Sequence, residues 1–101
     1  MYTYPRYTWD ASKSARNLLQ RGFDFEFATL IFDEFTLERA DVRREYGERR
    51  MVAIGNAQGI MLTVVYTDRF KTAQTLERRI ISARRSNRNE REAYQQAIEG
   101  G

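Results

Sequence analysis

Apolar residues recur at helical spacing over the first third of the chain, and a capping residue precedes each run. Asp10 can cap a helix over Ala11–Arg21, and Gly22 can close it in the left-handed conformation that glycine tolerates. Asp24 can cap a second helix, whose broad apolar face ends near Asp33–Glu34. The pattern therefore predicts two helices in the first third of the chain.

A short strand is expected before the first helix, and another after the second. Pro5 has no N–H to donate to a sheet ladder, so a strand around it belongs at a sheet edge. The aromatic residues of this strand are Tyr2, Tyr4, Tyr7 and Trp9. Phe35–Leu37 resembles a strand, whereas Glu38–Glu45 is rich in charge, which predicts a short strand followed by a loop.

The middle of the chain has the composition of a β-hairpin. Glu48–Gly55 and Ile60–Thr67 are rich in strand-forming residues, and Asn56–Gly59 joins them as a four-residue connection. Both alternating sets of Ile60–Thr67 are largely apolar, which is typical of an interior strand that is covered on both faces. Leu76–Ala83 is predicted as a further strand.

A last helix is predicted to begin after Asn87. Asn87 can cap it, and Glu90, three residues later, completes a capping box. Its narrow apolar face consists of Ala93, Tyr94, Ala97 and Ile98. The predicted order is a strand, two helices, three or four antiparallel strands and a helix. This order describes an α+β fold, a small antiparallel sheet with two N-terminal helices and one C-terminal helix.

The composition is that of one small domain spanning residues 1–101. The chain of 12.0 kDa is 42% hydrophobic and 31% charged, and it can build a single core. It has no cysteine and no histidine, which excludes disulfide scaffolds, zinc fingers and any chemistry that needs a thiolate or an imidazole. We expect no cofactor and no bound metal, although carboxylates alone would still allow a metal site.

The sequence indicates no membrane partner. No stretch approaches the roughly 18 to 20 apolar residues that span a bilayer. Residues 1–9 lack the basic start and the apolar run of a signal peptide. The expected location is cytoplasmic.

Positive charge is concentrated in the second part of the chain and is carried by arginine. Residues 1–40 have a net charge of −1 and the rest +4, and fifteen of the 17 basic residues are arginine. The window 78–91 has a net charge of +5, from Arg78, Arg79, Arg84, Arg85, Arg88 and Arg91 against one glutamate. Guanidinium groups pair bidentately with phosphate or carboxylate. The window therefore suits RNA or an acidic protein partner, or it is simply a solvated face.

Motifs that follow one another along the chain resemble those of a known family. The first half has Trp9-Asp10-x-x-Lys13-x-x-x-Asn17-Leu18, then Gly22, Phe25-Glu26-x-Ala28 and Phe32. The second half has Gly47-Glu48-x-Arg50, Ile54-Gly55, Val64-Val65-x-Thr67, and Arg79-Ile80-Ile81-Ser82-Ala83-Arg84-Arg85 with Glu90 and Tyr94. With these motifs the chain resembles BrnT, a toxin family of type II toxin–antitoxin systems, from about Trp9 to Tyr94.

The resemblance implies a RelE-like ribonuclease fold and an RNA substrate whose cleavage arrests translation. It also implies a BrnA-like antitoxin that neutralises the toxin in a heterotetramer and provides the only contact with operator DNA. The sequence departs from the family pattern at three places. Gln20-Arg21 and Tyr66 stand where many relatives have histidine, and Phe70–Glu77 is longer than the usual connection. A mechanism based on imidazole therefore does not apply to this chain.

RNA can be cleaved without metal when the 2′-hydroxyl attacks the adjacent phosphate in line, because the protein then only positions the strand, stabilises negative charge and moves two protons. Arginine suits the charge but is a poor proton carrier, since its pKa exceeds about 12. Proton transfer would fall to Glu90, Tyr66, Tyr94 or Lys13. The expected catalytic residues are Arg79, Arg84, Arg85, Glu90 and Tyr94. The expected substrate-binding residues are Lys13, Arg50, Tyr66 and Arg88.

Structural roles compete for several of these residues. The spacing from Asn87 already explains Glu90 as part of a capping box, and Tyr94 lies on the apolar helix face. Lys13 and Asn17 share a helix face at i, i+4 and form a structural unit with the residues before them.

Strand alternation divides the arginines between two faces. If the strand Leu76–Ala83 continues through the next two residues, alternation places Arg79 and Arg85 on one face and Arg78 and Arg84 on the other. The four arginines cannot all serve one site unless the strand ends or bulges near Ala83.

Three functions remain open. The family resemblance favours a toxin ribonuclease. A non-catalytic nucleic-acid-binding domain would use the same basic face without a competent proton carrier. A structural subunit would use its arginines only to dock an acidic partner.

Overall fold

The structure is a computed structural model and describes residues 5–43 and 45–100, which contain five strands, three α-helices and one 3₁₀ helix. In chain order the elements are β1 (Arg6–Trp9), α1 (Ala11–Arg21), α2 (Phe25–Ala28), the 3₁₀ helix η1 (Thr29–Asp33), β2 (Leu37–Ala40), β3 (Met51–Ala57), β4 (Ile60–Phe70), β5 (Leu76–Arg85) and α3 (Arg88–Gly100). The α+β class is confirmed. Tyr2 and Tyr4 of the predicted first strand lie outside the described residues.

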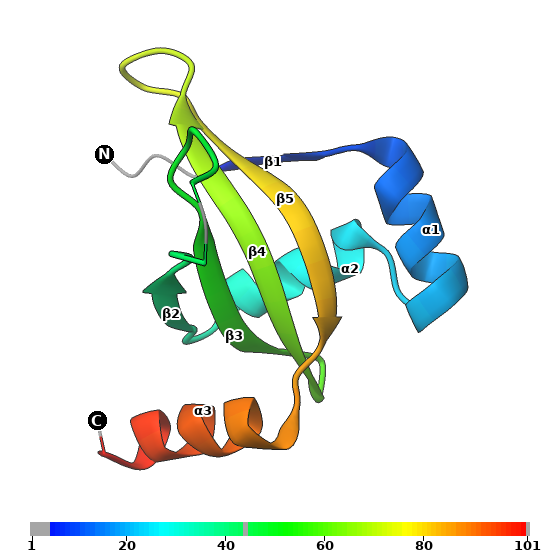
Figure 1. Cartoon of the computed structure of the whole chain (residues 1–101), viewed down its shortest axis with the longest axis vertical. Helices are drawn as coiled ribbons and strands as arrows, with labels where there is room; N and C mark the ends of the chain where they lie inside the picture. The colour runs from blue at the N-terminus through cyan, green and yellow to red at the C-terminus, as the bar shows by residue number, and fades with distance from the viewer. Residues whose placement is uncertain (1–4, 44, 101) are drawn as a thin grey trace.

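The five strands form one mixed sheet in the order β1-β5-β4-β3-β2 (Figure 1). At one edge β1 runs parallel to β5, with Arg6 opposite Glu77 and Trp9 opposite Ile80, whereas the other neighbouring strands are antiparallel. Parallel neighbours need a long connection, and the helices and strands between β1 and β5 supply it. The edge position of the first strand is confirmed. The expectation of a small antiparallel sheet is wrong, because the sheet is mixed and has five strands.

One face of the sheet packs against α2 and η1 and holds the hydrophobic core. β4 lies between β3 and β5 and contributes Leu62, Val64 and Tyr66, and Ile31 of η1 is fully buried in the same cluster. The remaining core residues are Phe23, Phe25, Ala28, Ala53, Ala57, Ile80 and Ala83. In Figure 1, α2 lies behind the sheet. The predicted interior position of Ile60–Thr67 is confirmed.

Polar contacts dock α1 beside the end of β5. The Ser14 hydroxyl accepts a hydrogen bond from the backbone N–H of Phe25 at 2.9 Å, and the Asn17 amide donates to a backbone carbonyl before α2. Arg21 donates to the carbonyl of Ala83 in β5 at 2.8 Å.

Within the described ranges, no helix is long and apolar enough to cross a bilayer.

The predicted helix caps are confirmed. Asp10 and Asp24 each accept a hydrogen bond from the backbone N–H three residues ahead, at 3.0 and 2.9 Å. Gly22 closes α1 with a φ of 88°. Asn87 and Glu90 exchange backbone-to-side-chain hydrogen bonds of 2.9 and 2.8 Å, which is the predicted capping box.

The strand predicted at Phe35–Leu37 lies further along the chain, in β2. Glu38 and Arg39 were expected in a loop, but they pair with Ala53 and Val52 of β3. Charged side chains are common on edge strands, where they discourage pairing with other chains. The charge of this segment therefore marks an edge strand rather than a loop.

The hairpin connection has two residues rather than four. Asn56 and Ala57 belong to β3 and pair with the start of β4. Gln58 and Gly59 form the turn with φ angles of 51° and 91°, both positive as two-residue hairpin turns require.

Three other elements differ from their predicted lengths. β4 continues to Phe70 and β5 to Arg85, beyond the predicted ends. The second helix is α-helical only to Ala28 and then tightens into η1. Because β5 is longer than predicted, the arginines at its end belong to the sheet.

A bulge in β5 reverses the predicted alternation of its arginines. Val65 of β4 pairs with Ser82, but the next residue, Tyr66, pairs with Ile80, so Ile81 is an extra residue in β5. Arg79 and Arg84 pair with Thr67 and Thr63 of β4, which point to the same side of the sheet. The prediction that Arg79 and Arg84 lie on opposite faces is therefore wrong.

The contact between β3 and η1 leaves no room for a side chain at Gly55. A Cβ there would lie 2.8 Å from the Cβ of Ile31 and 3.1 Å from a methyl group of Thr36. We expect Gly55→Ala to lower the free energy of unfolding by about 1–3 kcal/mol, because overpacking forces neighbouring atoms apart. Urea denaturation followed by circular dichroism measures this change.

The control for this prediction is Gly100→Ala, where no atom lies within 4 Å of the added Cβ. It should leave the unfolding midpoint unchanged or raise it slightly, since alanine favours the helix. Equal stability of Gly55→Ala and the parent chain would contradict the tight contact between η1 and β3.

Candidate functional site

The sheet face opposite the core carries five arginines, and we call it the arginine face. Cross-strand pairing joins Arg39 to Val52, Val52 to Val65, and Val65 to Ser82 in a row across the middle of the sheet. A second row contains Thr63 and Arg84, and a third contains Thr67 and Arg79. Arg50 directly precedes β3 and extends the third row. The arginine face is thus an apolar strip with Arg39, Arg50, Arg69, Arg79 and Arg84 around it.

Arg79 is one of the cations of this face that the described residues leave unpaired. It is half-buried, and its guanidinium has no hydrogen bond or ion pair with any described residue. All five of its N–H groups are therefore available to a ligand. It lines a cavity of about 140 Å³ together with Asp10, Lys13, Glu48, Arg50 and Arg69. Four cations converge on this small space, which favours an anionic ligand.

Lys13 reaches the cavity from α1. The Asp10 cap and the bond from Arg21 to β5 place α1 beside the bulged part of β5, so its first turn faces Arg79. The ammonium group of Lys13 forms no hydrogen bond or ion pair in the part of the chain that the structure describes. Lys13 therefore adds a cation with transferable protons to the arginine face.

Glu48 holds two arginines at the other side of the cavity. Its carboxylate accepts hydrogen bonds from Arg69 at 2.8 Å and from Arg50 at 3.1 Å. Both bonds lower the pKa of Glu48, and the bond from Arg69 has the larger effect. The guanidinium of Arg50 also lies 4.0 Å from the centre of the Tyr46 ring. Glu48 and Tyr46 therefore restrict the position of Arg50.

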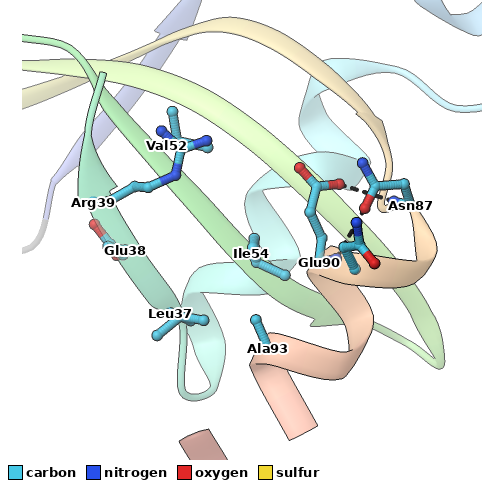
Figure 2. Close-up of a pocket in the computed structure, with 9 residues that line it drawn as sticks. Leu37, Glu38, Arg39, Val52, Ile54, Asn87, Glu90 and Ala93 are labelled. Atoms are coloured by element: carbon cyan, nitrogen blue, oxygen red, sulfur yellow. Dashed lines mark hydrogen bonds between the residues drawn. The ribbon is translucent and has the colours of Figure 1, made fainter. Parts of the chain in front are cut away.

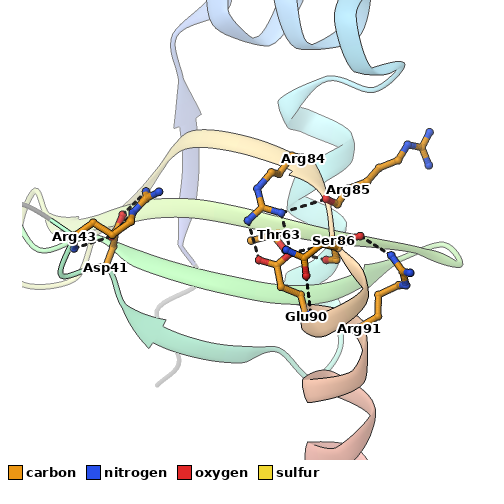
Figure 3. Close-up of polar contacts among 9 residues, drawn as sticks. Asp41, Arg43, Thr63, Arg84, Arg85, Ser86, Glu90 and Arg91 are labelled. Atoms are coloured by element: carbon orange, nitrogen blue, oxygen red, sulfur yellow. Dashed lines mark hydrogen bonds and ion pairs between the residues drawn. The ribbon is translucent and has the colours of Figure 1, made fainter.

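Arg84 is held by Glu90 in a bidentate ion pair (Figure 3). Both Glu90 oxygens accept from the Arg84 guanidinium, each at 2.7 Å. Glu90 also accepts from the Thr63 hydroxyl at 3.0 Å and from the backbone N–H of Asn87, and Thr63 shares a hydrogen bond with Ser86. This network joins β4, β5 and α3 at one end of the arginine face.

The environment of Glu90 makes it a weak base. Hydrogen bonds, chiefly from Arg84, lower the pKa of Glu90 to about 2. At neutral pH the carboxylate is therefore ionised and fully engaged. Arg84 keeps two N–H groups free of any partner among the described residues. The geometry gives Glu90 a positioning role, fixing an arginine that still has donors for a ligand.

The two tyrosines predicted for the site use their hydroxyls elsewhere. Tyr66 lies on the core face, where its hydroxyl donates to Glu38 and its ring packs against Arg78. Tyr94 is buried, and its hydroxyl donates to the carbonyl of Phe35 at 2.9 Å. Burial raises the pKa of both hydroxyls. Neither hydroxyl faces Arg79.

Two more of the predicted residues lie apart from the arginine face. Arg85 follows Arg84 in β5 and points to the opposite side, where it lines a groove with residues of α1 and α2. Arg88 lies on the outer surface of α3 and pairs with Glu92 at 3.0 Å. The structure thus brings together Lys13, Arg50, Arg79 and Arg84, with Glu90 at the border. It does not bring Tyr66, Arg85, Arg88 or Tyr94 to them.

Sequence reasoning missed three residues of this surface. Arg39 was assigned to a loop, but it lies in β2 on the same face as Leu37. Glu48 stands in the motif Gly47-Glu48-x-Arg50 but was not given a role, and Arg69 lies in the part of β4 beyond its predicted end. In residues 5–43 and 45–100, no cluster of three or more carboxylates is placed to hold a metal ion.

Comparison with models of known protein families gives a match that covers most of the chain. The model of a family described as "Ribonuclease toxin, BrnT, of type II toxin-antitoxin system" matches residues 9–90. The match includes Lys13, Arg50, Arg79, Arg84 and Glu90. No curated protein matches the chain.

The Glu90 network predicts an acid-dependent contribution to stability. Because the pKa of Glu90 is about 2 in the folded chain and near the ordinary glutamate value of 4.5 when unfolded, its contribution is complete above about pH 5 and is lost as the pH falls toward 2. We expect Glu90→Gln to lower the free energy of unfolding at pH 7 by about 1–2 kcal/mol. This change is smaller than the pKa shift alone would give, because solvent screens the exposed guanidinium of Arg84. Urea denaturation of both chains at several pH values measures the difference, which should shrink between pH 5 and 2.

Glu92→Gln is the matched control, since it removes an exposed ion pair from the same helix. It should change the free energy of unfolding by no more than about 0.5 kcal/mol at any pH. A difference between Glu90→Gln and the parent chain that stays constant down to pH 2 would contradict the assignment to the Glu90 carboxylate.

Proposed function

Because the chain belongs to the BrnT family of ribonuclease toxins of type II toxin–antitoxin systems, we propose that its arginine face is the site that binds and cleaves RNA. The observation that carries this proposal is the position of Arg79. It is an arginine without a protein partner among the described residues, in a cavity that it shares with Lys13 and Arg50. A guanidinium kept free beside other cations is suited to phosphate.

The bound RNA strand would pass over β5 between Arg79 and Arg84. Their partners on β4, Thr67 and Thr63, are four residues apart, which corresponds to about 13 Å along the strand. Arg84 uses the N–H groups that Glu90 leaves free, whereas Arg79 can use all of its own. The two arginines thus contact different phosphates of one RNA strand, and the cleaved bond lies beside Arg79.

Cleavage proceeds by attack of a 2′-hydroxyl on the adjacent phosphorus. The new bond from the 2′-oxygen forms as the bond to the 5′-oxygen breaks, leaving a 2′,3′-cyclic phosphate and a 5′-hydroxyl. Arg79 stabilises the negative charge on the phosphoryl oxygens. Lys13 donates the proton that the departing 5′-oxygen takes up, and the proton of the 2′-hydroxyl passes to water.

We propose that this reaction needs no metal. The arginine face itself supplies positive charge at the phosphate through Arg50 and Arg79, which is the task a divalent ion performs in other nucleases. The sequence has neither histidine nor cysteine to serve as a metal ligand.

One observation favours a second candidate function, RNA binding without cleavage. Glu90, Tyr66 and Tyr94 are three of the four proton carriers considered from the sequence, and all three are engaged with protein groups. Only Lys13 remains on the arginine face. A chain in which Lys13 does not transfer protons would bind RNA on the same face without turnover.

The positive charge of the arginine face also indicates the kind of partner that the toxin binds. We propose that a BrnA-like antitoxin places carboxylates against Arg79 and its neighbours, in a heterotetramer that contacts operator DNA only through the antitoxin. The family membership and the arginine face support this proposal. We further propose that the fold is RelE-like and that RNA cleavage arrests translation.

The role of Arg79 is tested by substitution. We expect Arg79→Ala to slow cleavage of a fluorescent RNA oligonucleotide by about 10²- to 10³-fold, because a preorganised donor to the transition state is lost. Arg79→Lys should retain only part of the rate, since lysine keeps the charge without the planar fork. The matched control is Arg49→Ala, an exposed arginine outside the arginine face. Unfolding midpoints of the variants should equal that of the parent chain.

The same assay distinguishes the two candidate functions. Cleavage that is unchanged by EDTA supports the metal-free reaction, whereas loss with EDTA and recovery with magnesium would contradict it. Retention of RNA without cleavage would favour the binding function. Full activity of Arg79→Ala would show that the site lies elsewhere.

The antitoxin proposal predicts a salt-sensitive association. We expect the association rate of toxin and antitoxin, followed by stopped-flow fluorescence, to fall as salt is raised, while the dissociation rate changes much less, because screening mainly weakens long-range steering. Expression of the toxin alone should arrest growth, and co-expression of the antitoxin should restore it. Harmless expression together with a salt-independent association rate would contradict the proposal.

A further inference from the structure

A pocket beside the arginine face has an apolar floor and a polar rim (Figure 2). It has a volume of about 360 Å³ and lies between β2, β3 and α3. Val52 and Ile54 of β3 form its floor, and Leu37 of β2 and Ala93 of α3 form opposite walls. Ligand pockets of proteins start at about 300 Å³, so this one has room for a single flat group.

The rim of the pocket carries hydrogen-bonding groups that the protein does not use. Arg39 extends from β2 toward its pairing partner Val52 (Figure 2), and its guanidinium has no hydrogen bond or ion pair with another described residue. The side chain of Asn89 likewise has no partner within the described ranges, and only the oxygen of the Asn87 amide is engaged, by the N–H of Glu90. The rim therefore offers unused donors and an amide acceptor next to apolar surface.

The pocket is continuous with the proposed path of the RNA. Glu90 forms part of its rim and also holds Arg84, so the pocket opens directly beside one of the two arginines assigned to phosphate. Arg39 belongs to both the pocket and the arginine face. A strand bound at Arg79 and Arg84 therefore passes the opening of the pocket.

We propose that this pocket holds one unstacked base of the RNA and thereby sets a base preference near the cleaved bond. The inference rests on the proposed function of the arginine face. Proteins recognise single-stranded RNA by stacking a splayed base on apolar or guanidinium surfaces and by hydrogen bonds to its edge. Val52 and Ile54 supply the apolar surface, Arg39 supplies a guanidinium, and Asn89 supplies the edge contact.

A base fits these groups better than an apolar side chain of a protein partner. An inserted leucine or phenylalanine would cover the floor but would form no hydrogen bond with the amide of Asn89 or the guanidinium of Arg39, so both groups of the exposed rim would stay unused. A base satisfies both demands, because its faces are apolar and its edge is polar. Arg39 on the rim and Arg84, which Glu90 holds beside the pocket, also suit the phosphates attached to that base.

The experiment measures binding of an RNA analogue that cannot be cleaved. A six-nucleotide 2′-fluoro oligonucleotide lacks the attacking hydroxyl, and a set of six further oligonucleotides each lacks the base at one position. Fluorescence anisotropy gives the dissociation constant of each. With the parent chain we expect one position at which removal of the base weakens binding about 10-fold, the size of one base contact.

Two variants locate that base. Ala93→Leu fills the pocket from an exposed position of α3, and it should weaken binding of the complete oligonucleotide about 10-fold while leaving the corresponding abasic oligonucleotide unaffected. Gln96→Leu places the same side chain at an exposed position of α3 outside the pocket and should change neither. Arg39→Gln should alter which base is preferred at that position.

Each outcome decides between the inference and its alternatives. Equal binding of all abasic oligonucleotides, or an unchanged abasic pattern in Ala93→Leu, overturns the base pocket. Loss of antitoxin affinity in Ala93→Leu with RNA binding intact would assign the pocket to the protein partner instead. Base-dependent binding by a chain that does not cleave ordinary RNA would support the base pocket and contradict the ribonuclease proposal. Cleavage without a base preference would support the ribonuclease proposal and contradict the base pocket.

Discussion

The extra residue in β5, Ile81, determines how the sheet divides its two faces. Ile80 and Ala83 are both buried in the core, although a regular strand would direct residues three apart to opposite faces. The bulge at Ile81 lets both reach the core, and the same shift turns Arg84 to the side of Arg79. The packing of the core and the assembly of the arginine face therefore depend on one feature of the backbone.

The ion pair of Arg84 and Glu90 links the stability of the fold to the geometry of the site. The carboxylate caps α3, binds Thr63 of β4 and orients the guanidinium at the same time. Removing it would loosen the attachment of α3 to the sheet and free an arginine that is now held in one direction. If the arginine face binds RNA as proposed, Glu90 contributes through Arg84, whose guanidinium it holds, rather than by its own contact with the ligand.

Local signals along the chain were sufficient to predict the helix starts but not the faces of the strands. Asp10, Asp24 and Asn87 cap their helices through bonds to residues three positions away, and such bonds can be inferred from sequence. The parallel pairing of β1 with β5 joins distant segments, and no local pattern announces it. The bulge at Ile81 follows from core packing, so the alternation predicted for Arg84 was wrong, and the role of Arg84 in a functional site stays a prediction.

Charge on the arginine face does not change across the neutral pH range. Guanidinium groups in proteins keep their charge at any physiological pH, and the Glu90 carboxylate stays ionised because its pKa is about 2. A histidine-based nuclease could lose its charge near neutrality, but this face has no group of that kind. If the arginine face cleaves RNA as proposed, pH cannot silence its electrostatic contribution. Control would then come from a molecule that covers the face, and membership in a toxin–antitoxin family implies such a partner, the antitoxin.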